Sequence, residues 1–264
     1  MKLIAWDTSS RSGSVVAFEA EPGSDQIRII SEWVLSVQTS HSEGLLWAIH
    51  QVLKSARWTL DEVDCFGVGA GPGSFTGLRI GLTTARTFAH SLCKPLVGVS
   101  SLFVLAYPAL TWISELQPDT MMIVATDACK GELYVLAGTA QDLKKQAFIQ
   151  KKSRNVIEDV LTPQKMVAWV SGRMKAKKNK WMRIGEAKDR YPEQWDLLPL
   201  KRELRCPDLL SSLGQGRALA EVVWQEYQQK KSNTSALSVF PRYIRASDAE
   251  VKLKSGLIKR APTS

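Results

Sequence analysis

The sequence predicts an α/β protein made of two related lobes. Short apolar runs alternate with segments whose apolar residues recur every three or four positions, which is the pattern of strands alternating with helices. The segments Leu3–Thr8 and Ile123–Ala128 are also alike, because each is an apolar strand with Ala two residues before a terminal Asp. Each leads into a predicted hairpin. A duplicated α/β unit with a boundary near 110–120 is the most economical interpretation.

Composition and charge limit the class of protein. The chain has 264 residues, of which 44% are apolar and 23% charged, as is usual for a folded protein. The net charge of +9 first suggests an anionic partner. The excess is local, however: residues 141–183 contain twelve Lys or Arg and three Asp or Glu, and residues 242–264 contain six and two. The charge therefore belongs to one stretch and one tail.

Several classes of protein are disfavoured. The four cysteines form no CxxC pair, so we expect a reducing cytoplasmic location rather than a disulfide framework or a zinc knuckle. The first apolar run is too short for a signal peptide, and no stretch approaches the roughly 20 apolar residues of a membrane span. His41, His50 and His90 do not have metal-ligand spacing. We therefore expect no metal site and no membrane contact.

Two helices, predicted at 44–53 and 74–92, each carry an apolar seam. The spacing of three and four residues places the seam on one side of each helix. The seam residues are Leu45, Leu46, Ile49 and Val52 in the first helix and Phe75, Leu78, Leu82, Ala85 and Ala89 in the second.

A glycine loop, Gly71-Pro72-Gly73-Ser74, separates a predicted buried strand from the second helix. Glycine permits close backbone approach, and the free amides of a helix N-terminus favour an anion. The loop is not a Walker loop, because no Lys-Ser/Thr follows the glycines, and it is not GxGxxG. Gly77 and Gly81 instead continue a row of small residues that permits close helix packing. The segment thus predicts a phosphate site, a packing surface, or both.

Asp7 and Asp127 each end a predicted strand. Carboxylates at the carboxyl ends of strands lie where α/β folds bind ligands, and they can hold Mg²⁺. Alternatively, each Asp caps its own turn through the backbone. The sequence leaves both interpretations open. The candidate nucleotide- or phosphate-binding residues are Asp7, Thr8, Ser9, Gly71, Gly73, Ser74 and Asp127.

Residues 69–81 closely resemble the signature of the TsaB (YeaZ) family. That family is required for synthesis of threonylcarbamoyladenosine at position 37 of tRNAs reading ANN codons. The resemblance is strong over 1–138, weak over 139–235, and resumes at 241–245. It also includes Asp7-Thr8, His41, Gly98-Val99-Ser100, Asp127-Ala128, Gly131–Tyr134 and Pro241–Arg245.

The resemblance implies an actin/Hsp70/sugar-kinase type of fold, with two duplicated lobes of mixed sheets flanked by helices. We expect an N-terminal lobe at 1–112, a C-terminal lobe at 113–245 with the basic stretch 141–183, and a polar basic tail at 246–264. The catalytic paralogue TsaD has a His-x-x-x-His after the strand that follows this helix. Ser101 and Leu105 occupy those places here, so the resemblance implies a chain without catalytic or metal-binding residues.

The family pairs through its first two helices, with itself or with TsaD. The resemblance therefore implies a scaffold and activator that binds TsaD through His41 and the two seams, with TsaE as the ATPase. It implies a homodimer when the chain is alone, indirect or weak tRNA contact, and no cofactor of its own, with ATP or ADP near the partner interface as an option.

Three other functions are less well supported by the sequence. A nucleotide-binding phosphotransferase of the same fold would use Asp7, Asp127 and the glycine loop. A tRNA-binding subunit would use 141–183, where Trp169 and Trp181 accompany the basic residues. A peptidase is disfavoured, because Gly-x-Ser-x-Gly and the metal-ligand histidines are absent.

Overall fold

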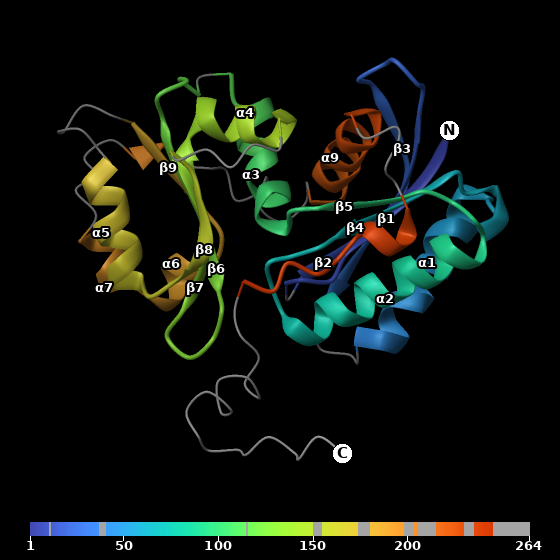
Figure 1. Cartoon of the computed structure of the whole chain (residues 1–264), viewed down its shortest axis with the longest axis horizontal. Helices are drawn as coiled ribbons and strands as arrows, with labels where there is room; N and C mark the ends of the chain where they lie inside the picture. Colours follow the sequence, from blue (N-terminus) through green and yellow to red (C-terminus); the bar gives the residue numbers. More distant parts are fainter. Residues whose placement is uncertain are drawn as a thin grey trace, which may run out of the picture.

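The computed structural model contains two five-stranded mixed sheets, each with helices on both faces (Figure 1). This confirms the mixed sheets flanked by helices that the sequence predicts. The structure describes residues 1–10, 12–36, 41–114, 116–149, 155–173, 180–197, 203–204, 215–229 and 235–244. Within these ranges, no helix is long and apolar enough to cross a membrane.

The first sheet has the strand order β3-β2-β1-β4-β5. β2 is antiparallel to β1 and to β3, whereas β4 and β5 continue the sheet parallel to β1. Ile4 and Trp6 of the central strand face one core, and Leu3 and Ala5 face the other, because successive side chains alternate across a strand. The strands are β1 (Lys2–Asp7), β2 (Ser12–Ala20), β3 (Ile27–Ser36), β4 (Cys65–Gly69) and β5 (Leu96–Val99).

Among the residues that the structure describes, four helices cover the first sheet. The helices predicted at 44–53 and 74–92 are present as α1 (His41–Ala56) and α2 (Phe75–Ser91), and both pack on the Ile4 and Trp6 face. The opposite face packs against α3 (Ser101–Trp112) and α9 (Gln215–Gln229). A short 3-10 turn, η1 (Leu60–Glu62), leads from α1 toward β4.

The second sheet repeats the strand order and directions of the first when its order is read from β8 to β10, so that β6 corresponds to β1 and β7 to β2. Its order is β10-β9-β6-β7-β8, with β7 antiparallel to β6 and β8, and with β9 and β10 parallel to β6. That the lobes arose by duplication stays a prediction. The strands are β6 (Met121–Asp127), β7 (Leu133–Thr139), β8 (Ile157–Leu161), β9 (Trp181–Ile184) and β10 (Glu203–Leu204). The helices are α4 (Ala140–Ile149), α5 (Pro163–Arg173), α6 (Ala187–Arg190) and α7 (Pro192–Asp196).

Two helices, α3 and α9, pack outside the simple division into two lobes. α3 packs against both sheets, with Val104 in a core of the first lobe and Leu102 in a core of the second. α9 lies within 113–245, the range expected to form the second lobe, yet it packs on the first sheet (Figure 1). Its apolar side covers the Leu3 face of that sheet, which would otherwise be left partly exposed. By its position in the sequence α9 belongs to the expected second lobe, but in the structure it is part of the first lobe.

Trp224 should make the attachment of α9 essential to stability. Its side chain is fully buried, and its indole Nε1 donates to the carbonyl oxygen of Ser24 at 2.7 Å. Trp224→Ala is expected to lower the free energy of unfolding by about 3–5 kcal/mol, because it leaves a cavity beneath the sheet. Urea denaturation followed by circular dichroism measures the loss. Trp47→Ala, at a side chain that is 51% exposed, is the control and should cost much less; equal losses would contradict the assignment.

Candidate functional site

The turn after β1 is tied to the first turn of α2. The backbone N–H of Ser74 donates to the carbonyl oxygen of Ser9 at 2.7 Å. The Thr8 hydroxyl donates to the carbonyl oxygen of Gly77 at 2.7 Å. The Ser74 hydroxyl caps the helix by accepting from the N–H of Gly77 at 3.3 Å. The hydroxyls of Thr8 and Ser74 thus bond within the chain.

The glycines of this segment are required for the close approach. A Cβ at Gly73 would lie 2.4 Å from the carbonyl oxygen of Ser9, and one at Gly77 would lie 2.0 Å from that of Thr8. A Cβ at Gly81 would lie 2.3 Å from the Thr8 hydroxyl. Real side chains do not occupy such space, so the row of small residues has a packing role.

Asp7 caps the turn that follows it. Its Oδ1 accepts from the backbone N–H of Ser9 at 2.8 Å. The carboxylate lies directly over Gly69, where a Cβ would be 2.2 Å from Oδ2. Burial raises the pKa of Asp7, while hydrogen bonds from Ser9 and Ser101 act in the opposite direction. The surroundings of this carboxyl therefore favour the protonated form.

Asp127 has the same local turn but a different charge environment. Its Oδ1 accepts from the backbone N–H of Cys129 at 2.9 Å, as Asp7 accepts from Ser9. Its Oδ2 lies 2.9 Å from Nη1 of Arg190, and only 7% of its side chain is exposed. The Tyr191 hydroxyl lies 3.5 Å from Oδ1. Asp127 is therefore an ion-paired group of the second lobe.

Residues 235–244, called here the C-terminal strap, run over the glycine loop. The N–H of Arg242 donates to the carbonyl oxygen of Ala70 at 2.8 Å. On the other side of the loop, the N–H of Gly71 donates to the Ser101 hydroxyl at 3.2 Å, and the N–H of Ser101 donates to the carbonyl oxygen of Gly71 at 2.9 Å. The N–H and carbonyl groups of Gly71 are thus both bonded within the chain.

Glu158 bonds the second lobe to both the first lobe and the strap. Its two carboxylate oxygens accept from Nη1 of Arg242 at 3.0 and 2.9 Å. The Ser100 hydroxyl, just before α3, donates to the same carboxylate at 2.5 Å. Glu158 belongs to β8 of the second lobe, so these bonds join three segments that are remote in the sequence.

The predicted phosphate-binding residues are therefore largely gathered in one place. All of them except Asp127 lie around the start of α2, where they bond to one another and to Gly77 and Ser101. The contact between Glu158 and Arg242 was missed by sequence reasoning. Arg242 belongs to the Pro241–Arg245 segment of the family resemblance, but no sequence pattern pairs two residues 84 positions apart.

Most of the predicted interface residues require a correction. Seven seam side chains are at most 3% exposed and lie in the chain's own core, so they offer little surface to a partner. Ile49 is the one of the seven that also lines the groove described below. The seams face the first sheet, whose apolar surface they cover. Leu46 and Phe75 are exposed, at 52% and 37%, and the side chain of His41 lies outside the described residues. The buried seven are Leu45, Ile49, Val52, Leu78, Leu82, Ala85 and Ala89.

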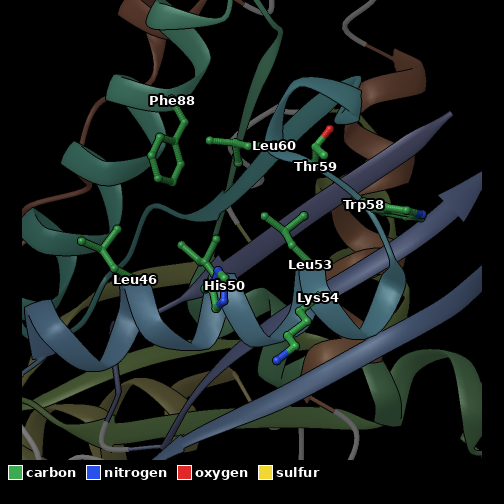
Figure 2. A pocket seen from close by; sticks show the side chains of 9 residues that line it. Leu46, His50, Leu53, Lys54, Trp58, Thr59, Leu60 and Phe88 are labelled. Atoms are coloured by element: carbon green, nitrogen blue, oxygen red, sulfur yellow. The ribbon is translucent and has the colours of Figure 1, made fainter.

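An apolar groove lies between α1, α2 and η1, with a volume of about 490 Å³ (Figure 2). Figure 2 shows Phe88 and Leu60 directed toward the side chains of α1. The groove is lined by Leu46, Ile49, His50, Leu53, Lys54, Trp58, Thr59, Leu60 and Phe88.

Exposed aromatic and aliphatic side chains continue beside Leu46. Trp47 is 51% exposed, and its ring meets that of Trp33 on β3 with centroids 4.9 Å apart. Val34, the next residue on β3, is 47% exposed. An apolar surface of this kind on a folded chain commonly marks a site of protein association.

The basic stretch 141–183 is only partly described. Residues 150–154 and 174–179 lie outside the described residues, as does the tail 246–264. Lys144 and Lys145 are exposed on α4, and the guanidinium of Arg183 lies 5.6 Å from the ring centroid of Trp181. RNA binding by this stretch stays a prediction.

Comparison with known proteins identifies the family. Residues 30–183 match the family model of TsaD, tRNA N6-adenosine threonylcarbamoyltransferase. A tRNA threonylcarbamoyladenosine biosynthesis protein TsaB from Haemophilus influenzae is 26% identical over 93% of this chain and 94% of its own length. One from Buchnera aphidicola subsp. Schizaphis graminum is 28% identical over 79% of this chain and 97% of its own length.

A solved structure, YeaZ from Pseudomonas aeruginosa, has the same fold, with a TM-score of 0.64 at 22% identity, covering 92% of this chain and 99% of that one. Fold and site together define a two-lobed α/β protein whose glycine loop is covered by the C-terminal strap. The chain belongs to the TsaD family, and within it to the TsaB (YeaZ) branch.

Gly77→Ala should reverse the usual effect of replacing a helical glycine. Alanine normally stabilises a helix by up to about 1 kcal/mol relative to glycine. Here the new Cβ would overlap the Thr8 carbonyl oxygen, and we expect a loss of about 1–3 kcal/mol in the free energy of unfolding. Gly172→Ala on α5 is the matched control, because a Cβ there meets nothing within 4 Å. Urea denaturation of both variants should show a lower free energy of unfolding for Gly77→Ala and an equal or higher one for Gly172→Ala.

Asp7→Asn should change how stability depends on pH. Because burial raises the pKa of Asp7, the folded chain holds this proton more tightly than the unfolded chain. The resulting stabilisation is complete below the ordinary aspartate value and is lost as pH rises through the raised pKa. As the pH rises above about 4, the ordinary aspartate pKa, the stability of the wild type relative to Asp7→Asn should therefore fall.

The measurement is urea denaturation of both proteins at a series of pH values from about 4 upward. Burial also raises the pKa of Glu32, but this residue is present in both proteins, so its effect cancels in the difference. Parallel stability profiles for the two proteins would show that Asp7 does not have a raised pKa.

Proposed function

We propose that this chain is a non-catalytic subunit that binds TsaD through the α1–α2 groove. In this role it supports threonylcarbamoyl transfer to adenosine 37 of tRNAs reading ANN codons. The match to the TsaD family model and the names of the TsaB relatives support a role in tRNA threonylcarbamoyladenosine biosynthesis. The single observation that carries the binding mode is the exposed apolar groove between the first two helices.

The chemistry of the groove suits a docked helix. Its walls and floor are largely aliphatic and aromatic, and Leu46 is half exposed at its edge. The polar groups of His50 and Lys54 are also part of the lining. A partner helix with an apolar stripe and flanking acidic side chains would therefore fit it. In the absence of TsaD, a second copy of this chain would use the same groove as a homodimer.

The residues that replace the metal ligands of TsaD have structural contacts instead. The Ser101 hydroxyl accepts from the N–H of Gly71, and Leu105 packs against the core that α3 shares with the second sheet. These contacts support a scaffold and activator, with TsaD supplying the metal and the chemistry and TsaE the ATPase.

The phosphotransferase alternative is less well supported. It needs glycine-loop amides that are free to bind phosphate, whereas two of them, those of Gly71 and Ser74, donate to Ser101 and Ser9. ATP or ADP near the partner interface stays a prediction. Calorimetry of the isolated chain with Mg-ATP tests this option.

Leu46→Glu should separate partner binding from folding. A carboxylate at this edge of the groove would be buried by an apolar partner, so we expect at least about a tenfold loss of affinity for TsaD. Co-purification with TsaD and nucleoside analysis of tRNA, in cells co-expressing TsaE, measure the two consequences. The thermal transition should barely change, because the side chain is half exposed.

Leu197→Glu is the matched control, since this leucine is 66% exposed in the second lobe. It should retain both TsaD binding and the modified nucleoside. Unchanged co-purification together with an unchanged nucleoside level in Leu46→Glu would show that the groove does not bind TsaD.

A further inference from the structure

We infer that α2 and the C-terminal strap together form a binding site for unpaired RNA nucleotides. The site, called here the arginine–aromatic face, consists of Phe75, Arg79 and Arg86 on α2 and of Phe240 and Tyr243 on the strap. None of these residues lines the α1–α2 groove. None of the five belongs to the basic stretch 141–183 either.

Helix geometry and strap packing bring the five residues together. Arg79 lies four residues after Phe75, and Arg86 lies seven after Arg79, so all three are on one side of α2. The short 3-10 turn η2 (Ala236–Ser238) of the strap packs against α2. It places the aromatic residues that follow it beside the arginines.

Each arginine lies against an exposed aromatic ring. The guanidinium carbon of Arg79 is 4.0 Å from the ring centroid of Phe75, and that of Arg86 is 5.5 Å from the ring centroid of Phe240. Tyr243 lies 5.0 Å from Phe75 between centroids, and its hydroxyl accepts from Nε of Arg79 at 3.4 Å. Phe240 and Tyr243 are 65% and 45% exposed. Rings and cations are therefore already positioned, with ring surface open to solvent.

The charge of the face is uncompensated. α2 and the strap carry Arg79, Arg86 and Arg242 but no Asp or Glu. Arg242 is neutralised by Glu158. In the part of the chain that the structure describes, neither Arg79 nor Arg86 forms an ion pair. Two unneutralised guanidinium groups beside exposed rings are the complement of a polyanion.

Single-stranded RNA matches both features of the face. Unpaired bases stack on aromatic rings and on guanidinium planes, while their phosphates pair with arginine. A duplex hides the faces of its bases, so it would use the charge and not the rings. Under the proposed function, the source of these nucleotides is the anticodon loop of tRNA. That identification rests on the proposed function, whereas the binding chemistry does not.

The test is fluorescence anisotropy of the full chain with a labelled anticodon stem-loop RNA, across a series of salt concentrations. A blunt RNA duplex of equal length is the second probe. Arg79→Gln/Arg86→Gln should weaken stem-loop binding at least about tenfold and lower the salt slope by about 1.4, since each phosphate contact contributes about 0.7. Phe240→Ala should weaken it by about five- to a hundredfold through lost stacking, with little effect on the salt slope.

Lys144→Gln/Lys145→Gln removes the same charge from exposed positions on α4 and should change the affinity less than about threefold. Circular dichroism melts establish that each variant folds, which we expect for Phe240→Ala because its side chain is mostly exposed. Equal losses in the arginine and lysine variants, or equal affinity for the duplex and the stem-loop, would overturn the inference.

The result also distinguishes RNA from a protein ligand. If Phe240→Ala abolishes co-purification with TsaD and leaves RNA affinity unchanged, the face binds protein and the inference is wrong. Leu46→Glu should lose TsaD and retain RNA binding. Because RNA affinity is measured on the chain alone, failure of the proposed TsaD contact leaves this readout intact.

Discussion

The contact between the turn after β1 and the first turns of α2 positions the rest of the site. Thr8 and Ser9 approach the helix so closely that Gly73, Gly77 and Gly81 have no room for a side chain. This contact holds the start of α2 close to the first sheet. α1 packs beside α2 on the same face of the sheet. The groove between the two helices, the cap of α2 and the path of the strap all depend on where α2 lies relative to this turn.

One helix consequently contributes to three surfaces. Leu82 and Ala85 are part of the core beneath α2, and Phe88 helps to form the groove. Phe75 and Arg79 belong to the arginine–aromatic face. The proposed protein partner and the proposed RNA ligand would therefore meet different sides of the same rigid element. The strap, which passes over the glycine loop, also contacts the second lobe through the ion pair between Arg242 and Glu158.

Local pattern was enough to predict α1 and α2, because each helix repeats its apolar residues at helical spacing. The same pattern misled the choice of interface residues. A seam that covers the chain's own sheet and a seam that binds a partner have the same spacing, so Leu82 and Ala85 could not be told from exposed positions such as Leu46. The predicted phosphate site had a similar ambiguity, since glycines serve close packing and anion binding through the same lack of a side chain.

By itself, the sequence determined the alternation of strands and helices, the glycine loop before α2, the two aspartate turns and the family. These are properties of neighbouring residues, and local spacing and backbone preference specify them. The tertiary structure decided which helix faces are buried, the return of α9 to the first sheet and the passage of the strap over the loop. Such contacts join Trp224 to Ser24 and Arg242 to Glu158. They depend on which apolar surfaces cover one another once the whole chain has packed.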